Sequence, residues 1–246
     1  MSNWDAIVIG AGVIGTSVAY NLAAMGAKRV LVLERDQIGS GTTSQSSGIL
    51  RTHYSVVENI ELAQQSWAIF KNFAEHLHDE DASAGLVNCG YLIAAPEGPK
   101  LSPLSEALAA QLARGIEVIK LSQQEATERL PICRFDDAAL IGFEPEAGFA
   151  DAYLVASSYA RVARRLGVKF MEGENVTRLL LEQHKVVGVE TKRGVFHAPV
   201  VISTQSIWSQ ELTQWTGIEV PLLPERHKVI ALEGPEAYTY SMPVYK

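Results

Sequence analysis

The chain opens with a pattern that predicts a short buried strand, a turn and a helix. Ala6 to Ile9 is continuously apolar, and from Thr16 to Met25 the apolar residues follow a helical spacing, with Gly26 as the stop. Arg29 to Glu34 is a second apolar run. An apolar strand, a helix and another apolar strand within about 30 residues predict a βαβ unit, and such units build parallel sheets covered on both faces.

Further elements follow from the same periodicity. Arg35 to Thr52 is rich in Gly, Ser and Thr without sustained spacing, which predicts a long ordered loop or a loop broken by short turns. Ser122 has the position of an N-cap, with Glu125 completing a capping box. We expect Trp67, Phe70 and Phe73 to belong to the core. The predicted helices are Val56–Leu77, Leu101–Arg114, Ser122–Leu130 and Asp151–Leu166, and Gly90–Ala95 is a predicted strand.

The last third of the chain alternates short β-like runs with turn residues, which predicts a β-meander. A buried strand at Pro199–Ser203 and a helix at Ile207–Trp215 then place a second strand-to-helix turn at Ser203–Ser206. Tyr240 to Lys246 is strand-like, and we interpret this ending as an interruption. The runs assigned to the meander are Val168–Phe170, Val176–Leu181, Lys185–Thr191 and Val195–His197.

Composition narrows the function classes. The 246 residues are 47% hydrophobic, and the net charge of −7 leaves no excess of basic residues to bind nucleic acid or an anionic membrane surface. No export signal and no apolar run of about 18 residues is visible, so neither secretion nor a membrane span is expected. Cys89 and Cys133 are expected to be isolated buried thiols, with a single disulfide as the alternative. Low cysteine usage favours the cytoplasm.

Three glycines between the first strand and the first helix form a dinucleotide-binding motif. Gly10 permits a tight turn, Gly12 lets the backbone approach a pyrophosphate, and Gly15 allows the helix to pack closely on the strand. The phosphates then meet the helix N-terminus, which carries unpaired N–H groups and the positive end of the helix dipole. Glu34, 19 residues after Gly15 at the end of the second strand, can accept hydrogen bonds from ribose hydroxyls and would repel the 2′-phosphate of NADP. The alternative is a surface charge paired with Arg35.

FAD and NAD share this motif, and the residues after Glu34 favour FAD. The segment from Glu34 to Tyr54, with its Gly41-Thr42-Thr43-Ser44 stretch, resembles the loop of the D-amino-acid-oxidase-like flavoproteins, especially sarcosine oxidase β-subunits and glycine oxidases. Weaker matches continue through almost the whole chain; they include Gly90-Tyr-Leu, Gly148-Phe-Ala-Asp151 and Val187-Gly-Val-Glu-Thr191.

The resemblance implies which residues bind the cofactor. The loop would wrap the pyrophosphate, Val176 would contact the adenine through its backbone, and Thr204 to Trp208 would match a turn over the cofactor. The family has small residues and glycine where this chain has Gln205 and Ser206, so these side chains would crowd the cofactor or change the turn. The implied cofactor-binding residues are Gly10, Gly12, Val13, Ile14, Gly15, Glu34, Arg35, Gly41, Thr42, Thr43, Ser44, Val176, Thr204 and Trp208.

Substrate and attachment residues are less well defined. Arg51 matches the position that often holds the substrate carboxylate, for which a guanidinium is suited by bidentate pairing. The alternative is a loop arginine that binds a phosphate or a surface acid. Some relatives attach FAD covalently through a histidine in this loop; Ser44 to Ser47 contains none, so noncovalent FAD is expected, and His53 is interpreted as a loop or core residue. The scattered histidines predict no metal site, and no residue stands out as catalytic.

The resemblance implies an α/β fold with inserted α+β elements, namely a Rossmann-like, glutathione-reductase-type FAD-binding fold with a β-meander and a partial substrate domain. The expected division is 1–85 and 145–220 for FAD, and 86–144 and 221–246 for substrate. The implied reaction is oxidation of a small amine or amino acid by hydride transfer to flavin. Family members are longer, so a fragment, a subunit completed by a partner and a noncatalytic FAD-binding chain are alternatives, as is an NAD-linked dehydrogenase.

Overall fold

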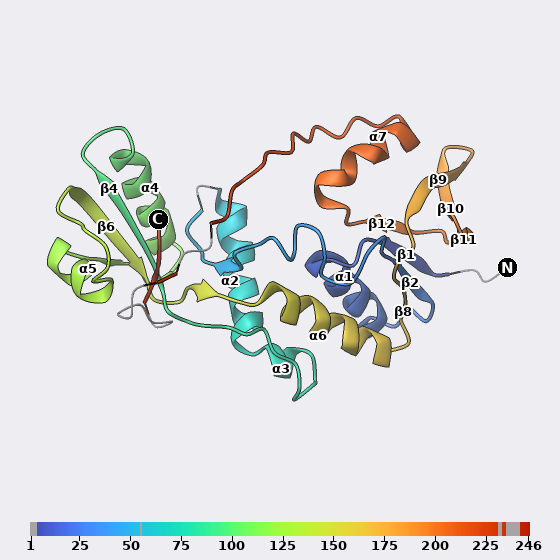
Figure 1. Ribbon diagram of the computed structural model, residues 1–246, viewed down its shortest axis with the longest axis horizontal. Helices are drawn as coiled ribbons and strands as arrows, with labels where there is room; N and C mark the ends of the chain where they lie inside the picture. Colours follow the sequence, from blue (N-terminus) through green and yellow to red (C-terminus); the bar gives the residue numbers. More distant parts are fainter. Residues whose placement is uncertain (1–3, 55, 231–232, 235–241) are drawn as a thin grey trace. The chain divides into compact units, whose positions relative to one another are not determined.

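A computed structural model describes residues 4–54, 56–230, 233–234 and 242–246. The described residues form two compact units (Figure 1). The first contains residues of Met1–Ser46, Leu77–Ser83 and Ala152–Lys228, and the second contains residues of Ser47–His76, Ala84–Asp151 and Val229–Lys246. Residues 47–76 therefore fall in the second unit, whereas the expected division placed them in the first domain; which unit binds which ligand stays a prediction.

The first unit is built on a four-stranded parallel sheet in the order β12-β1-β2-β8. Both central strands are buried along their whole length, as expected for a parallel sheet covered on both faces. Helices α1 and α6 run side by side, with the rings of Tyr20 and Tyr159 5.5 Å apart (Figure 1). The elements of this unit are β1 (Ala6–Ile9), α1 (Val13–Ala24), β2 (Val30–Leu33), α6 (Ala152–Arg165), β8 (Lys169–Met171), β9 (Val176–Glu182), β10 (Lys185–Thr191), β11 (Gly194–His197), β12 (Val201–Ser203), η1 (Ser206–Gln210) and α7 (Glu211–Thr216).

A three-stranded antiparallel meander, β9-β10-β11, packs against the parallel sheet. Ile7 and Leu31 project from one face of the sheet, because alternate residues of a strand share a face, and they join Leu179 and Val189 in one buried cluster. The meander has three strands rather than the four predicted. The segment predicted at Val168–Phe170 was assigned wrongly, because it forms β8 and pairs in parallel with β2.

The second unit contains a mixed sheet in the order β13-β4-β6-β5, in which only β13 is parallel to its neighbour among the described strands. Two hydrophobic clusters on this sheet include Leu92 and Phe143 in one and Leu104 and Leu108 in the other. The elements are β3 (Ile49–Leu50), α2 (Val57–Lys71), α3 (Phe73–His76), β4 (Tyr91–Pro96), α4 (Leu101–Leu112), β5 (Ile119–Lys120), α5 (Gln123–Arg129), β6 (Ala138–Glu144), β7 (Gly148–Phe149) and β13 (Val244–Tyr245).

Local features of this unit agree with the predictions in part. The capping box of α5 is present, with Ser122 and Glu125 bonded in both directions. The long helix predicted from Val56 to Leu77 is instead two helices separated at Asn72. Strand β6, which the periodicity did not predict, lies in the middle of the sheet.

Smaller predictions about single residues gave mixed outcomes. Trp67 and Phe73 are buried, as expected, while Phe70 is only half-buried. Cys89 and Cys133 are free and half-buried, so the thiols are isolated but less enclosed than predicted. Part of the strand predicted at Tyr240–Lys246 lies outside the described residues, and the rest contains β13, which pairs with β4.

Candidate functional site

The turn between β1 and α1 has no room for side chains. A Cβ on Gly15 would lie 2.0 Å from the carbonyl oxygen of Gly10, so helix α1 passes directly over the turn. Gly10 has φ of 99°, a left-handed conformation that glycine adopts readily. The close packing of helix α1 on the glycine turn, which the motif predicted, is therefore present. The first turn of α1 carries N–H groups that have no intrahelical acceptor, which is the arrangement that binds anionic groups.

The loop after β2 lies against the start of α1. The Val13 N–H donates to the hydroxyl of Thr43 over 3.0 Å, and a Cβ on Gly12 would lie 2.8 Å from the same oxygen. Thr42 donates to the Ser206 hydroxyl over 3.3 Å, which connects the loop to the turn after β12. Two hydroxyl-bearing residues of the loop are thus placed beside the helix N-terminus.

Glu34 is a buried carboxylate, only 8% exposed, at the end of β2. Its Oε2 accepts from the Ala11 N–H over 2.7 Å, and its Oε1 accepts from the Asp36 N–H over 2.9 Å. The alternative of a surface charge paired with Arg35 is wrong, because Arg35 pairs with Asp36 and lies over the Trp208 ring, 3.9 Å from its centroid. Each carboxylate oxygen keeps a lone pair for a further donor.

In the turn after β12, a residue other than glycine has a left-handed backbone conformation. Ser206 has φ of 52°, so a serine adopts the conformation that glycine provides at low cost. The Gln205 side chain accepts from Ser203 over 2.9 Å and donates to Glu211 over 3.3 Å. Thr204 donates to the carbonyl oxygen of Ile9 over 2.8 Å, which fixes the turn to β1. Gln205 and Ser206 both line the cleft described next, and whether they crowd the cofactor or change the turn stays a prediction.

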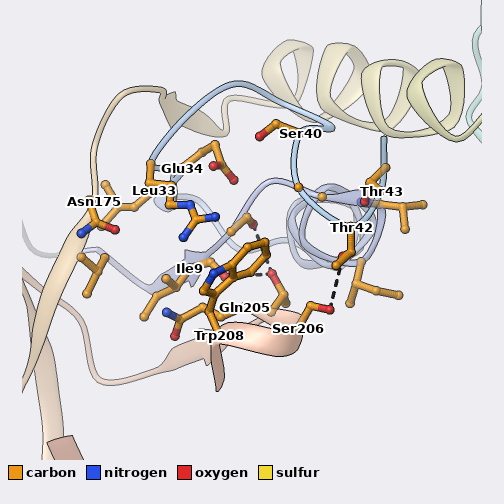
Figure 2. Close-up of a pocket in the computed structure, with 18 of the residues that line it drawn as sticks. Ile9, Leu33, Glu34, Ser40, Thr42, Thr43, Asn175, Gln205, Ser206 and Trp208 are labelled. Carbon is orange, nitrogen blue, oxygen red and sulfur yellow. Dashed lines mark hydrogen bonds between the residues drawn. The ribbon is translucent and has the colours of Figure 1, made fainter. Parts of the chain in front are cut away.

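These parts border one cleft in the first unit (Figure 2). Of the predicted cofactor-binding residues, two do not line it: Gly15 lies beneath the turn, and Ser44 donates its hydroxyl to Gly41 in the loop. The predicted residues that line it are Gly10, Gly12, Val13, Ile14, Glu34, Arg35, Gly41, Thr42, Thr43, Val176, Thr204 and Trp208. The lining residues that sequence reasoning did not predict to bind cofactor are Ile9, Leu33, Ser40, Glu174, Asn175, Gln205, Ser206 and Glu211.

Four of the missed residues follow a simple signal. Ile9 and Leu33 are the last residues of β1 and β2, and Glu174 and Asn175 lie just beyond the carboxyl end of β8. Ligands of open α/β sheets bind outside the carboxyl ends of the strands, so strand-end positions could have been included on that rule.

Arg51, in the second unit, is a cation without an acidic partner among the described residues. Its Nη1 donates to the carbonyl oxygen of His53 over 2.8 Å, and its guanidinium lies 5.0 and 5.2 Å from the ring centroids of Tyr54 and Tyr91. Arg51 and Tyr54 line a cavity in this unit with apolar residues of α2 that include Leu62. Pairing with a surface acid, one alternative for Arg51, is not seen in the part of the chain that the structure describes.

The described residues can also be compared with the requirements for a metal site and for a membrane-spanning helix. No group of three or more His, Cys, Asp or Glu side chains there could hold a metal ion. None of the helices described in the structure is long and apolar enough to cross a membrane.

The comparisons with known proteins decide the family. The profile of the family described as "FAD dependent oxidoreductase" matches residues 5–245. The chain belongs to this family. The resemblance inferred from the loop after Glu34 is therefore confirmed, and an NAD-linked dehydrogenase becomes the weaker alternative.

Two curated relatives of this FAD dependent oxidoreductase are amine-oxidising proteins by name. A 4-methylaminobutanoate oxidase (formaldehyde-forming) of Paenarthrobacter nicotinovorans is 26% identical over 98% of this chain and 29% of its own length. Sarcosine oxidase subunit beta of an Arthrobacter species is 27% identical over 94% of this chain and 57% of its own. The chain thus spans about three-tenths of the first relative's length and under three-fifths of the second's.

A solved structure supports the fold class. Glycine oxidase from Geobacillus kaustophilus superposes with a TM-score of 0.79 and 25% identity, covering 89% of this chain and 60% of that one. The predicted α/β class with a parallel sheet is confirmed by this likeness.

Proposed function

We propose that the cleft of the first unit binds FAD noncovalently, as part of an enzyme that oxidises a small amine or amino acid. One observation carries the proposal: a glycine turn without room for a Cβ, the N-terminus of α1 and the buried Glu34 carboxylate all border the same opening. A dinucleotide needs these three features together, because it presents a doubly charged pyrophosphate beside a ribose diol.

The lining residues fit the parts of the cofactor. The first N–H groups of α1, with Thr42 and Thr43, would hold the pyrophosphate, and the free lone pairs of Glu34 would accept from the ribose hydroxyls. Val176 would border the adenine. Trp208, which contacts Gly41 and Arg35, would close the side of the cleft that faces the loop.

The substrate class is inferred from Arg51 and from the relatives. FAD, when bound, accepts a hydride from the carbon beside an amine. A substrate that also carries a carboxylate would pair with Arg51, whose charge has no acidic partner among the described residues. The oxidases for sarcosine, 4-methylaminobutanoate and glycine named above support a small amine or amino acid.

The absorbance spectrum of the purified protein tests the cofactor. We expect flavin bands that move entirely into the supernatant after acid precipitation, because noncovalent FAD is released when the fold is lost. Glu34→Gln should bind FAD at least about tenfold more weakly, by loss of a charge-assisted bond. Saturable NAD binding by protein that takes up no FAD would overturn the proposal, and flavin that stays with the precipitate would overturn noncovalent attachment.

Two alternatives concern the chain's activity rather than its cofactor. Similarity to a sarcosine oxidase subunit beta favours a chain that works with a partner subunit. Native mass spectrometry would detect both the partner and the retained FAD. Tight FAD binding without bleaching by sarcosine, glycine or proline, in the presence or absence of the partner, would instead select a noncatalytic FAD-binding chain.

A further inference from the structure

The second unit contains a buried carboxylate that has no ion-pair partner among the described residues. Glu144, at the end of β6, is 3% exposed. Its Oε1 accepts from both the N–H and the hydroxyl of Thr52, each over 2.6 Å, and its Oε2 accepts from Nε2 of Gln111 over 3.2 Å. A carboxylate buried among neutral donors is costly, so its retention calls for a specific arrangement of those donors.

Gln111, on α4, extends this arrangement to His53. The amide is fully buried, and its Nε2 also donates to the Thr52 hydroxyl over 3.1 Å. Because Nε2 faces a carboxylate and a hydroxyl, Oε1 is the atom that faces His53 Nδ1, 3.0 Å away. An amide oxygen only accepts, so the His53 proton is on Nδ1. Burial also lowers the pKa of His53, which favours the neutral ring.

The bonded chain ends next to Arg51. Thr52 and His53, the two residues that follow it, are both fixed by Glu144 or Gln111, and the His53 carbonyl oxygen accepts from the Arg51 guanidinium. The guanidinium is thereby held beside Tyr54 at a cavity whose other walls are largely apolar. Those walls are Ile49, Leu50, Asn59, Leu62, Ala63, Ser66, Trp67 and Phe70.

We propose that Glu144 and Gln111 are positioning residues that hold Arg51 as a receptor for a carboxylate attached to an apolar or aromatic group. This proposal rests on the proposed function, since it specifies the ligand of Arg51. Glu144 acts through Thr52, and Gln111 acts through His53. The aromatic and aliphatic wall of α2 selects the apolar part of the ligand.

Benzoate binding to the full chain, followed by calorimetry, tests the receptor, with benzamide as the uncharged control. We expect benzoate to bind at least about tenfold more tightly than benzamide, and Arg51→Gln to remove the difference. Glu144→Leu, Gln111→Leu and the milder Thr52→Val should each weaken benzoate binding, by about tenfold for the first two. Glu146→Leu, which removes an exposed carboxylate of the same segment, should leave binding unchanged.

Two readouts separate positioning from a general loss of structure. In an Arg51→Gln background, Glu144→Leu should have no further effect on benzoate affinity. Glu144→Gln should rescue the affinity to within about threefold, because it keeps an acceptor for Thr52. The same variant presents an NH₂ to Gln111, which must turn over, so NMR should find the His53 proton moved from Nδ1 to Nε2.

Each failure has its own signature. Unchanged benzoate binding in Arg51→Gln overturns the carboxylate site. Loss of binding in Arg51→Gln with wild-type affinity in Glu144→Leu, Gln111→Leu and Thr52→Val overturns only the positioning role. If the leucine variants do not fold, benzoate binding by Thr52→Val and the His53 tautomer in Glu144→Gln still test the positioning role. Benzoate binding by protein that takes up no FAD would overturn the cofactor proposal and leave this one standing.

Discussion

Two buried carboxylates, one in each unit, are held in different ways. Glu34 borders an open cleft and accepts from the backbone N–H groups of Ala11 and Asp36. Glu144 accepts from one backbone N–H, that of Thr52, and also from the side chains of Thr52 and Gln111. The first site is therefore determined by the path of the backbone, and the second depends on the identity of side chains.

The largest effect should come from filling the glycine turn of the first unit. Gly15→Ala places a methyl group 2.0 Å from a backbone oxygen that cannot move alone, so we expect a loss of about 3 kcal/mol or more of unfolding free energy. Gly12→Ala meets only the Thr43 side chain, and should cost under about 1 kcal/mol while weakening FAD binding. Urea denaturation checks both, and equal losses would contradict a turn determined by backbone contact.

Replacing each carboxylate by its amide compares the two sites directly. Glu34→Gln leaves one of two fixed backbone N–H groups facing an amide NH₂, at a cost of about 1–3 kcal/mol. Glu144→Gln should cost about 1 kcal/mol near neutral pH, because the Gln111 amide can turn over and keep its bonds with residue 144 and His53 while one bond of the Thr52 hydroxyl is lost. Urea midpoints of both variants test this order. A larger loss of unfolding free energy for Glu144→Gln would show that side-chain donors adjust to an amide no better than backbone N–H groups do.

Stability should also depend on pH through Glu144. Burial raises the pKa of its carboxyl above the ordinary glutamate value, although its bonds with Thr52 and Gln111 and the Arg51 charge act in the opposite direction. The folded protein then holds this proton more tightly than the unfolded chain, so the contribution is fully present below about pH 4.3 and is lost as pH rises through the higher folded pKa. A difference of one between the folded and unfolded pKa values corresponds to about 1.4 kcal/mol of unfolding free energy.

The measurement is the difference in unfolding free energy between wild type and Glu144→Gln from about pH 4 to 7. We expect this difference to fall as the pH rises, because the variant lacks the titrating group. Glu146→Gln, at an exposed carboxylate paired with Lys71, is the control and should show no such trend. A difference that grows with pH would mean that the carboxylate is favoured in the folded state.

The same contrast explains what the sequence could predict. The glycine turn, Glu34 and the capping box of α5 depend on neighbours within one strand-turn-helix unit, so spacing and residue type were sufficient. The network around Glu144 joins residues 33 and 92 positions apart, and no local pattern reports such pairs. The resemblance indicated Arg51 as a candidate, but it did not indicate the neighbouring network of Glu144 and Gln111.

The errors in the fold have the same origin. Val168–Phe170 has the composition of a meander strand, but its partner is β2, more than a hundred residues earlier, and the parallel pairing depends on α6 returning the chain. Glu174 and Asn175 join the cleft because β8 lies beside β2, so they were missed together with that pairing. The break at Asn72 divides a continuous helical pattern, and the spacing of apolar residues does not reveal it.

The smallest predicted effect tests whether backbone geometry also determines the turn after β12, which borders the cleft. Ser206 has φ of 52°, which costs a residue with a Cβ about 1–2 kcal/mol relative to glycine. Glycine also increases the entropy of the unfolded chain, which reduces this gain in stability. We therefore expect Ser206→Gly to be more stable than Ser206→Ala by about 0.5–1 kcal/mol.

The alanine variant is the matched reference, because both substitutions remove the hydroxyl that accepts from Thr42 and only glycine relieves the left-handed backbone. Thermal or urea unfolding of the pair therefore isolates the backbone contribution. If Ser206→Gly is no more stable than Ser206→Ala, the turn after β12 is determined by its side chains. In that case it is held in the same way as the Glu144 network, and not in the way of the glycine turn between β1 and α1. If the expected gain is found, the turn retains the geometry of a glycine although a serine occupies it.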